Sequence, residues 1–301
     1  DLIPVRPAQH YTMGGVRTNH TGESPTLKGL FAAGEAACWD MHGFNRLGGN
    51  SVAETVVAGR IVGEFIADFC DRPENDLDIS TGLARDFLQR EQGKLDALLH
   101  GTGSENPNTL RVEMQNIMTD KVGIFRTGDN LASAVEELQK LLDRSRSIRV
   151  DYKARGANPE LVSAYRVQLM LKLALSIAYG ALQRTESRGA HYREDYPQRN
   201  DQEWLSRTLA VWKDGNDTLP ALSYEPLDVM AMELPPGWRG YGAKNQIDHP
   251  DSAKREEAVA QIKQGMSDAD RFTIQEALMP YEHLLPERFR GRNERIDERF
   301  S

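Results

Sequence analysis

The sequence predicts an α/β portion at the start of the chain, then an antiparallel helical bundle, and then an irregular or β-containing C-terminal region. Three observations support this order. Residues 1–70 combine many Gly with short apolar runs, which is typical of α/β folds. Residues 71–212 carry long stretches with helical apolar spacing. Residues 213–301 lose that spacing and gain Pro and Gly, so we expect three regions with these boundaries.

The composition is that of an ordinary folded protein. The 301 residues exceed the usual size of a single core, so two or three structural regions are expected. With 39% hydrophobic and 27% charged residues, the chain falls outside the disordered and fibrous classes. The formal net charge of -8 argues against general nucleic-acid binding, which needs a surplus of Lys and Arg.

The cysteines and the longest apolar stretch exclude further classes of protein. The two cysteines, Cys38 and Cys70, lack metal-ligand spacing. We therefore expect neither a disulfide framework nor a zinc or iron–sulfur site in this chain, and a reducing compartment fits. The stretch Leu169–Leu182 is interrupted by Lys172 and is too short to cross a bilayer. We expect no membrane span, so any membrane link comes through a partner.

The first region is expected to contain one buried strand and one long helix. The run Leu30–Ala33 predicts a strand that ends at Gly34–Glu35. After the turn at Gly48–Gly49, Ser51 is a candidate cap for a helix that runs to about Cys70. Apolar residues follow near helical spacing along it: Val52, Val56, Ile61 or Val62, Phe65 and Phe69.

The second region is expected to consist of amphipathic helices. The apolar pattern predicts four of them, at Ser80–His100, Asn108–Val122, Asn130–Ser145 and Pro159–Thr185. Short loops between them favour an antiparallel bundle. The fourth helix is apolar on most faces, so we expect it at the centre.

Two glycine turns suit a nucleotide ligand. At Gly34–Glu35, glycine permits a close backbone approach, and the carboxylate can accept hydrogen bonds from ribose or ribityl hydroxyls. After Gly48–Gly49, the amides of residues 50–52 would be unpaired at a helix N-terminus, where negative charge is favoured. Taken alone, the first is better explained as a plain strand-end turn, and the alternative for the second is a simple capped core helix.

Three motifs lie in order within the first 51 residues: His10–Gly15 (HYTMGG), Gly29–Glu35 (GLFAAGE) and His42–Ser51 (HGFNRLGGNS). Together they resemble the succinate dehydrogenase and fumarate reductase flavoprotein family. The resemblance continues at Ser187–His191 (SRGAH) and Asp195–Pro197 (DYP), and it extends to about residue 245. It implies that residues 1–70 are the C-terminal portion of an FAD-binding domain with substrate-site residues, followed by a helical domain and a C-terminal region with a charged tail.

The resemblance also implies roles for individual residues. In this family Glu35 would contact FAD, and Ser51 and Val52 would begin the helix that meets the isoalloxazine ring. His10 and Arg46 would bind the substrate, because a guanidinium holds a carboxylate through two hydrogen bonds and a histidine adds another donor. Without the motifs, His10 would be taken as a structural histidine and Arg46 as a surface ion-pair former.

Other polar segments have plainer interpretations. We expect His42 to act in packing or in a supporting hydrogen bond rather than in catalysis. The donor-rich loop Ser187–Pro197 is favoured as a latch that joins the helical region to the α/β region, although such loops also carry function. The segment Pro235–Tyr241 is either another latch or a subunit contact. Residues 282–301 are expected to form a solvated or subunit-covering tail.

Several features of the family are missing from this sequence. It has no Gly-x-Gly-x-x-Gly fingerprint, no candidate for the histidine that holds FAD covalently, and no match for the arginine that protonates the substrate. These elements precede this segment in the family, and Leu2–Pro7 already reads as the middle of a domain. We therefore expect an N-terminal truncation, and we assign no catalytic residue within this segment.

The implied parent enzyme interconverts fumarate and succinate by hydride transfer with FAD. The family passes electrons to or from an iron–sulfur subunit, and a membrane anchor subunit with a quinone site completes the complex. The expected location is the cytoplasmic face of the inner membrane, peripheral through partner subunits. The opening Ile3–Pro7 together with the first motif favours fumarate reductase slightly.

Two alternatives remain open. An L-aspartate oxidase shares a histidine–glycine segment and an Asn-Arg-Leu segment, but Gly48–Ser51 argues against it, since that family departs from the double glycine. The other is a non-catalytic scaffold that docks a redox partner and keeps a vestigial flavin site. The presence of His10, Glu35 and Arg46 weighs against the scaffold.

Overall fold

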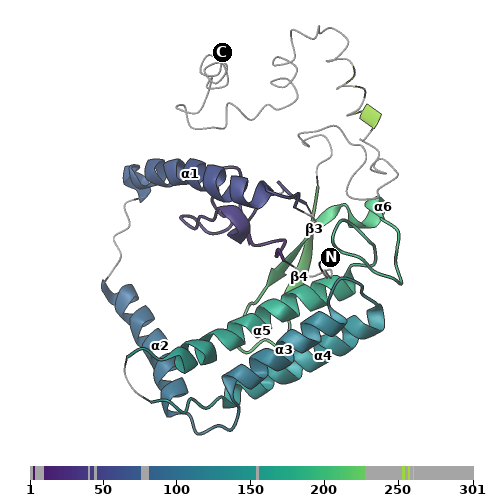
Figure 1. Ribbon diagram of the computed structural model, residues 1–301. Helices are drawn as coiled ribbons and strands as arrows, with labels where there is room; N and C mark the ends of the chain where they lie inside the picture. Colours follow the sequence, from purple (N-terminus) through teal and green to yellow (C-terminus); the bar gives the residue numbers. More distant parts are fainter. Residues whose placement is uncertain are drawn as a thin grey trace. The chain divides into compact units, whose positions relative to one another are not determined.

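The computed structural model describes residue 3, residues 10–39, 41–43, 46–75, 81–153 and 156–227, and positions 253, 254, 257 and 260. Residues 10–77 belong to one compact unit, which we call the N-terminal unit, and residues 78–227 belong to another, the helical unit. The chain is rich in helix and has few strands (Figure 1). The predicted domain boundaries at residues 70 and 212 stay predictions.

The N-terminal unit combines a short parallel strand pair with one long helix. Strand β1 (Val16–Arg17) pairs with β2 (Ala37–Cys38), so that Val16 lies opposite Ala37. A 3-10 helix, η1 (Gly34–Ala36), leads into β2 and packs against helix α1 (Asn50–Cys70), which a second 3-10 helix, η2 (Pro73–Asn75), follows. The predicted end of the long helix at Cys70 is confirmed.

Two local predictions in this unit are wrong. The run Leu30–Ala33 is not a strand, because only Phe31 pairs, in an isolated bridge with Glu23, and the 3-10 helix begins directly after it. Ser51 does not cap α1, because Gly49 takes the N-cap position with φ +83° and no side chain caps the helix. The left-handed backbone that glycine permits replaces the capping hydroxyl, and Ser51 lies within the first turn.

The helical unit contains the four predicted helices, and each boundary shifts by at most two residues. They are α2 (Thr81–His100), α3 (Pro107–Lys121), α4 (Gly128–Arg144) and α5 (Pro159–Gln183), with a short 3-10 turn η3 (Ser145–Ser147) after α4. The amide side chains of Asn106 and Asn158 and the hydroxyl of Thr127 accept hydrogen bonds from the first-turn amides of α3, α5 and α4. These caps fix where the helices begin.

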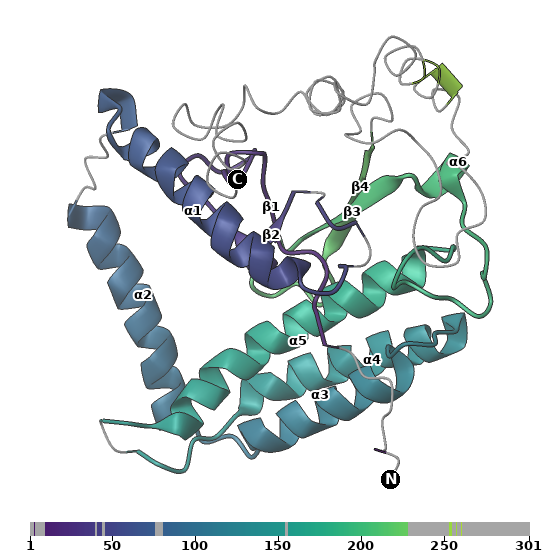
Figure 2. The same ribbon diagram turned by 45° about the horizontal axis from the view of Figure 1, so that its top comes forward.

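The core of the helical unit lies between α3, α4 and α5, which run side by side (Figure 2). Helix α5 contacts α2, α3 and α4, so its predicted central place is confirmed. The apolar stripe of α4 faces this core, as its spacing predicts. Among the described residues, the fully buried apolar side chains are Leu110, Leu131, Ala134, Leu138, Val150, Ala164, Val167, Leu171, Leu175 and Ala178.

Among the described residues, one helix, α5, has the length and the apolar composition needed to cross a bilayer. Its buried face, with Val167 and Leu171, packs against α3 and α4. Lys172 lies at its middle and donates to the carbonyl oxygen of Gly215 at 3.1 Å. The apolar composition of this face is therefore accounted for by core packing.

A β-hairpin follows the bundle. The short helix α6 (Asp201–Trp204) precedes β3 (Ser206–Val211), which pairs with the antiparallel strand β4 (Ala221–Pro226). β4 lies in the region where the sequence predicts strand or irregular structure. β3 lies wholly within residues 71–212, where helix is predicted, because the pairing with β4 overrides a weak local pattern. The segment Pro235–Tyr241 and residues 282–301 lie outside the described residues.

Replacing Leu175 by Ala should lower the free energy of unfolding by about 2–5 kcal/mol, because it leaves a cavity in a closed core. Leu175 is fully buried on α5, whereas Leu173 on the same helix is 57% exposed. Leu173→Ala removes the same atoms and should change stability by only about 0.5 kcal/mol. Urea denaturation followed by circular dichroism measures both, and equal losses would contradict this packing.

Candidate functional site

A cluster of polar side chains surrounds Tyr11 in the N-terminal unit. The guanidinium carbon of Arg46 lies 4.4 Å from the centroid of the Tyr11 ring. Arg46 Nη1 donates to the carbonyl oxygen of Leu47 at 3.2 Å. Its Nε is buried, and no acceptor for it occurs among the residues that the structure describes. A buried N–H without an acceptor is costly, so the guanidinium is held with one donor unused.

The Tyr11 ring lies between two further groups. Its edge meets the ring of His42, with centroids 6.4 Å apart and planes at 84°. The side chain of Ser51, in the first turn of α1, lies near enough to its hydroxyl to affect the pKa of Tyr11. Burial, and then the negative charges of Glu54 and Glu35, raise the pKa of Tyr11, so the hydroxyl remains protonated. Tyr11 thereby connects the first motif with the segment that leads into α1.

Glu54 provides the buried end of this cluster. Its side chain is 1% exposed, and both carboxylate oxygens are occupied. Trp39 Nε1 donates to Oε1 at 2.9 Å, and His42 Nε2 lies 2.6 Å from Oε2. The expected supporting hydrogen bond of His42 is confirmed. Sequence reasoning missed Glu54 and Trp39, and the available signal was an acidic residue inside an otherwise apolar stretch of α1.

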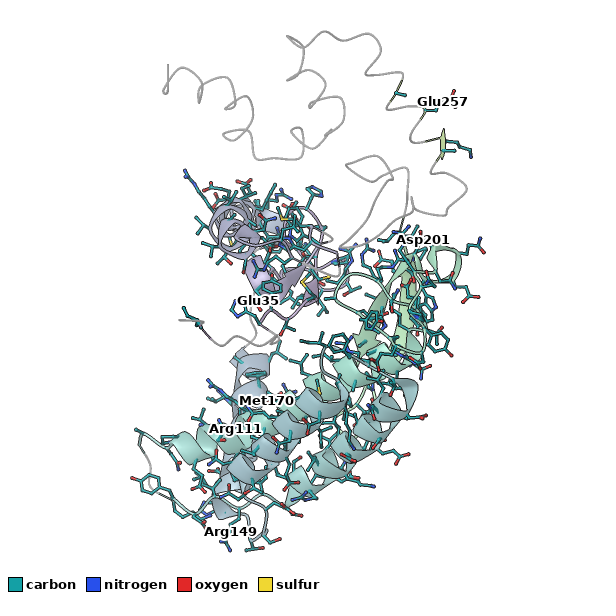
Figure 3. The ribbon with its side chains drawn as sticks, turned by 45° about the vertical axis from the view of Figure 1, so that its right-hand side comes forward. Glu35, Arg111, Arg149, Met170, Asp201 and Glu257 are labelled. Atoms are coloured by element: carbon teal, nitrogen blue, oxygen red, sulfur yellow. The ribbon has the colours of Figure 1, made fainter. Side chains whose placement is uncertain are left out.

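Glu35 lies in η1 of the same unit (Figure 3). Its side chain is exposed, and Oε1 accepts a hydrogen bond from the amide of Thr12 at 3.2 Å. The preceding Gly34 has φ +68°, and a Cβ there would come within 3.0 Å of the hydroxyl of Thr55 on α1. The glycine therefore allows η1 to pack closely on α1 while Glu35 faces outward.

The N-terminus of α1 is open. No side chain caps it, and a Cβ built on Gly48 or Gly49 would meet no atom within 4 Å. Val52 in the first turn is 70% exposed. The amide of Asn50 donates to the carbonyl oxygen of Leu47 at 3.2 Å, so the prediction that it is unpaired is wrong. The amides of Ser51 and Val52 lie at the positive end of the helix dipole, where a negatively charged group is favoured.

The predicted site residues are only partly brought together. Tyr11 connects Arg46 with Ser51, and Glu35 holds the amide of Thr12. His10 is exposed, and in the described ranges no hydrogen bond joins it to Arg46. The roles of His10, Arg46, Glu35, Ser51 and Val52 in binding stay predictions.

The loop Ser187–Pro197 belongs to a charged network in the helical unit. Arg193 is 2% exposed, and it donates through Nε and Nη2 to the two carboxylate oxygens of Asp195 at 2.8 and 2.7 Å. Its Nη1 donates to the carbonyl oxygens of Ala181 and Leu182 at the end of α5. Asp195 in turn accepts from the amide of Gly128 at the start of α4. The loop thus fastens α4 to the end of α5.

A second part of the network joins α5 to α6. Glu186 is fully buried and accepts hydrogen bonds from Arg184 and Arg188. Asp201, at the start of α6 (Figure 3), accepts from Arg188 at 2.7 Å and from Arg199 at 3.0 Å. The favoured interpretation as a latch therefore holds within the helical unit, and a link to the α/β region stays a prediction.

His191 is the buried histidine of this network. Its Nδ1 accepts from Arg126 Nη1 at 2.9 Å, and its Nε2 donates to the carbonyl oxygen of Arg184 at 3.2 Å. Burial first, and then the positive charge of Arg126, lower the pKa of His191 to about 4. The imidazole is neutral near pH 7 and acts as a structural hydrogen-bond partner.

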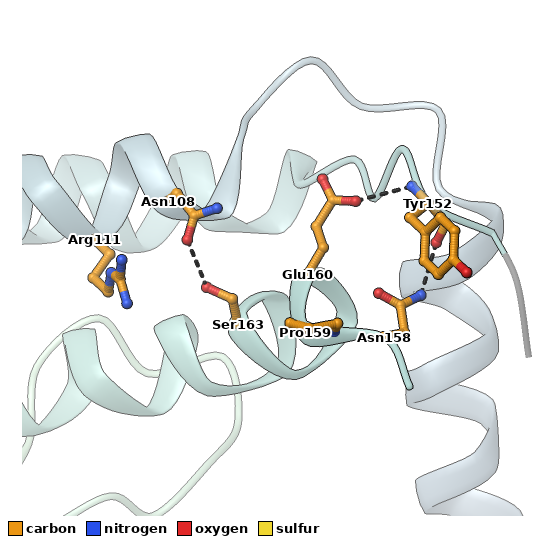
Figure 4. Close-up of a pocket in the computed structure, with 7 residues that line it drawn as sticks. All are labelled: Asn108, Arg111, Tyr152, Asn158, Pro159, Glu160 and Ser163. Carbon is orange, nitrogen blue, oxygen red and sulfur yellow. Dashed lines mark hydrogen bonds between the residues drawn. The ribbon is translucent and has the colours of Figure 1, made fainter. Parts of the chain in front are cut away.

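A surface cavity of about 470 Å³ lies at the starts of α3 and α5 (Figure 4). Most of its polar groups already pair with one another, Arg111 excepted. Ser163 donates to Asn108 at 3.2 Å, and Glu160 accepts from the amide of Tyr152 at 2.9 Å. We therefore assign no binding role to it. Among the described residues, no group of three metal-ligating side chains converges.

Two family models match the chain. Residues 1–52 match a model of an FAD binding domain, and residues 111–241 match a model described as fumarate reductase flavoprotein C-term. The N-terminal match covers the motifs that contain Glu35 and Arg46. The second match covers α4, α5 and the latch loop.

Curated relatives and solved structures indicate the same family as the two models. The fumarate reductase flavoprotein subunit of Helicobacter pylori is 51% identical over 98% of this chain and 41% of its own length. The succinate dehydrogenase flavoprotein subunit of Rickettsia bellii is 34% identical over 79% of this chain and 41% of its own length. The chain thus spans about two fifths of the length of these relatives.

Among solved structures, the FrdA chain of E. coli quinol fumarate reductase superposes with a TM-score of 0.71 at 34% identity, over 76% of this chain and 39% of that chain. Mycobacterium smegmatis Sdh1 in complex with UQ1 gives a TM-score of 0.61 at 32% identity, over 73% of this chain and 36% of that chain.

Replacing His191 by Gln should flatten the pH dependence of stability between about 6.5 and about 4. In the wild-type protein the unfolded chain takes up a proton in this window while folded His191 does not, so stability falls as the pH falls. Denaturant unfolding at pH 7 and pH 5 measures the difference. His100→Gln, at the exposed end of α2, is the control. An unchanged slope in the His191 variant would contradict the buried, neutral histidine.

Proposed function

Because the chain belongs to the succinate dehydrogenase and fumarate reductase flavoprotein family, we propose that it is part of a flavoprotein subunit that interconverts fumarate and succinate. The observation that carries the proposal is the buried Nε of Arg46, which lacks an acceptor in the described residues. A carboxylate is the ligand that best satisfies an arginine held in this way.

Arg46 is suited to bind one carboxylate of a C4 dicarboxylate. The Tyr11 ring packs against one face of the guanidinium. N–H groups in the plane of the guanidinium can then bind a planar anion. His10 belongs to the motif that Tyr11 connects with the segment leading into α1, and we assign it to a second hydrogen bond to the substrate. The role of these residues is to hold and orient the substrate, since proton delivery requires a group that we place in the remaining length of the family.

The N-terminal unit also fits FAD. The fit rests on the open start of α1, where Gly48 and Gly49 leave room beside the first amides, and on the exposed carboxylate of Glu35. We assign Ser51 and Val52 to the isoalloxazine ring and Glu35 to the hydroxyls of the cofactor chain.

FAD, when bound, supplies the hydride acceptor and donor for the interconversion of succinate and fumarate. The amides at the start of α1 would favour negative charge on the ring portion that they face. The motif that contains Arg46 leads directly into this helix, so substrate and cofactor would be held by consecutive residues of the chain.

We further propose the partners that the family implies. The similarity to quinol fumarate reductase supports a complex with an iron–sulfur subunit and a membrane anchor subunit that carries a quinone site. The subunit would then lie peripherally on the cytoplasmic face of the inner membrane. The identity of 51% with a fumarate reductase subunit favours fumarate reduction as the physiological direction.

The two alternatives have direct tests. An aspartate oxidase would produce hydrogen peroxide when L-aspartate is added, and we expect none. A scaffold with a vestigial site would show no flavin spectrum that bleaches with succinate, and we expect bleaching.

Arg46→Ala should lower succinate–fumarate turnover by roughly a thousandfold or more while FAD stays bound, because it removes a charge-assisted clamp in a buried site. Turnover and flavin content are measured on the same preparation of the full complex. Arg85→Ala, which removes an exposed arginine from α2, is the control and should leave both unchanged. Normal turnover of the Arg46 variant would refute its assignment to the substrate.

Gly49→Val should lower the midpoint potential of the flavin or release FAD, while the helical content measured by circular dichroism persists. Gly49 has φ +83°, a conformation that a branched side chain strains, and its Cβ would occupy the space before α1. Displaced amides would stabilise negative charge on the cofactor less well. Gly63→Ala, later on the same helix and also without a neighbour within 4 Å, is the control. A Gly49 variant with wild-type FAD content and potential would show that this helix terminus does not hold the flavin.

A further inference from the structure

We propose that Glu54 is a positioning residue of the substrate site, and that it fixes Arg46 through His42 and Tyr11. The inference rests on the proposed function, because it concerns how the dicarboxylate clamp is held. Glu54 itself is enclosed, with 1% of its side chain exposed, so it does not touch the substrate.

The burial of this carboxylate requires complete hydrogen bonding. An unpaired carboxylate in a protein interior costs several kcal/mol, and pairing of both oxygens offsets that cost. Trp39 and His42 provide the two donors, at 2.9 and 2.6 Å. Both belong to the segment between β2 and α1. Glu54 therefore fastens this segment, four residues before Arg46, to the first turns of α1.

His42 helps to position Arg46, because both side chains pack against the ring of Tyr11. The Tyr11 ring packs edge-on against His42, and the Arg46 guanidinium lies 4.4 Å above the same ring. The side chain of Ser51 lies near the Tyr11 hydroxyl. Ser51 and Glu54 are three residues apart on α1 and so share one face of the helix. Tyr11 is thus held at its ring by the histidine that Glu54 orients, and its hydroxyl lies near the same face of α1.

This arrangement links both sequence segments of the clamp to one helix. Tyr11 follows His10 directly, and Arg46 follows the His42 segment. A loosened Glu54 would therefore release the two candidate substrate residues together, while the packing of α1 on η1 through Thr55 and Gly34 would remain. Loss of Glu54 should weaken substrate binding more than cofactor binding.

The test compares Glu54→Gln with wild type in the full-length holoprotein. The amide keeps the size of the side chain but removes the negative charge from its bond with His42. We expect the KM for fumarate or succinate to rise about tenfold or more, with full FAD content. Amide hydrogen exchange should become faster in residues 10–13 and 39–47. Glu54→Asp, which keeps the charge, should recover part of both effects.

The control is Glu186→Gln, which neutralises a fully buried carboxylate in the helical unit. It should lower stability without changing KM or exchange in residues 10–13 and 39–47. A double variant with His42→Asn should be no worse than Glu54→Gln alone, since the two act in series.

An unchanged KM and unchanged exchange in Glu54→Gln, or the same changes in the Glu186 control, would overturn the proposal. If the wild-type holoprotein turns over neither dicarboxylate, the proposed function fails. The exchange comparison then still decides whether Glu54 fastens these segments: faster exchange in the variant supports the fastening, and identical exchange refutes it.

Discussion

Buried charge has to be fully hydrogen-bonded, and this constraint organises both units of the chain. In the N-terminal unit the carboxylate of Glu54 uses both oxygens, and the donors come from a segment that would otherwise be a loose connection into α1. In the helical unit Glu186 and Arg193 are buried with several partners each. Each pairing converts a loop into a fixed part of the structure.

The two networks differ in one respect that bears on function. In the helical unit Arg193 donates to Asp195 and to carbonyl oxygens at the end of α5, so its hydrogen-bonding groups are used within the protein. Arg46 in the N-terminal unit has a buried Nε without an acceptor among the described residues. A guanidinium that is supported but incompletely paired is what a ligand-binding arginine requires, whereas Arg193 is a structural residue.

Sequence reasoning succeeded where the determinants are local. The four bundle helices follow from apolar spacing, and the side chains of Asn106, Thr127 and Asn158 place the starts of three of them within two residues of the predictions. It failed at Leu30–Ala33, where an apolar run without a partner strand does not become a strand, and at Ser51, because the backbone of Gly49 replaced the cap. The apolar stretch around Glu54 marked it as an unusual acidic residue, but its hydrogen bonds could not be predicted, because Trp39 and His42 become its neighbours only in the folded chain.

The geometry of α1 also constrains how the site can work. The open first turn, assigned to the cofactor, and Glu54, which fastens the substrate segments, lie within five residues of one another on a single helix. A helix is stiff over such a length, since consecutive backbone hydrogen bonds fix each residue. Hydride transfer needs donor and acceptor atoms held about 3–3.5 Å apart. If each group were held by a separate loop, their errors of position would add. Because α1 would position both the cofactor and the substrate segments, a displacement of the helix would move them together and preserve their separation.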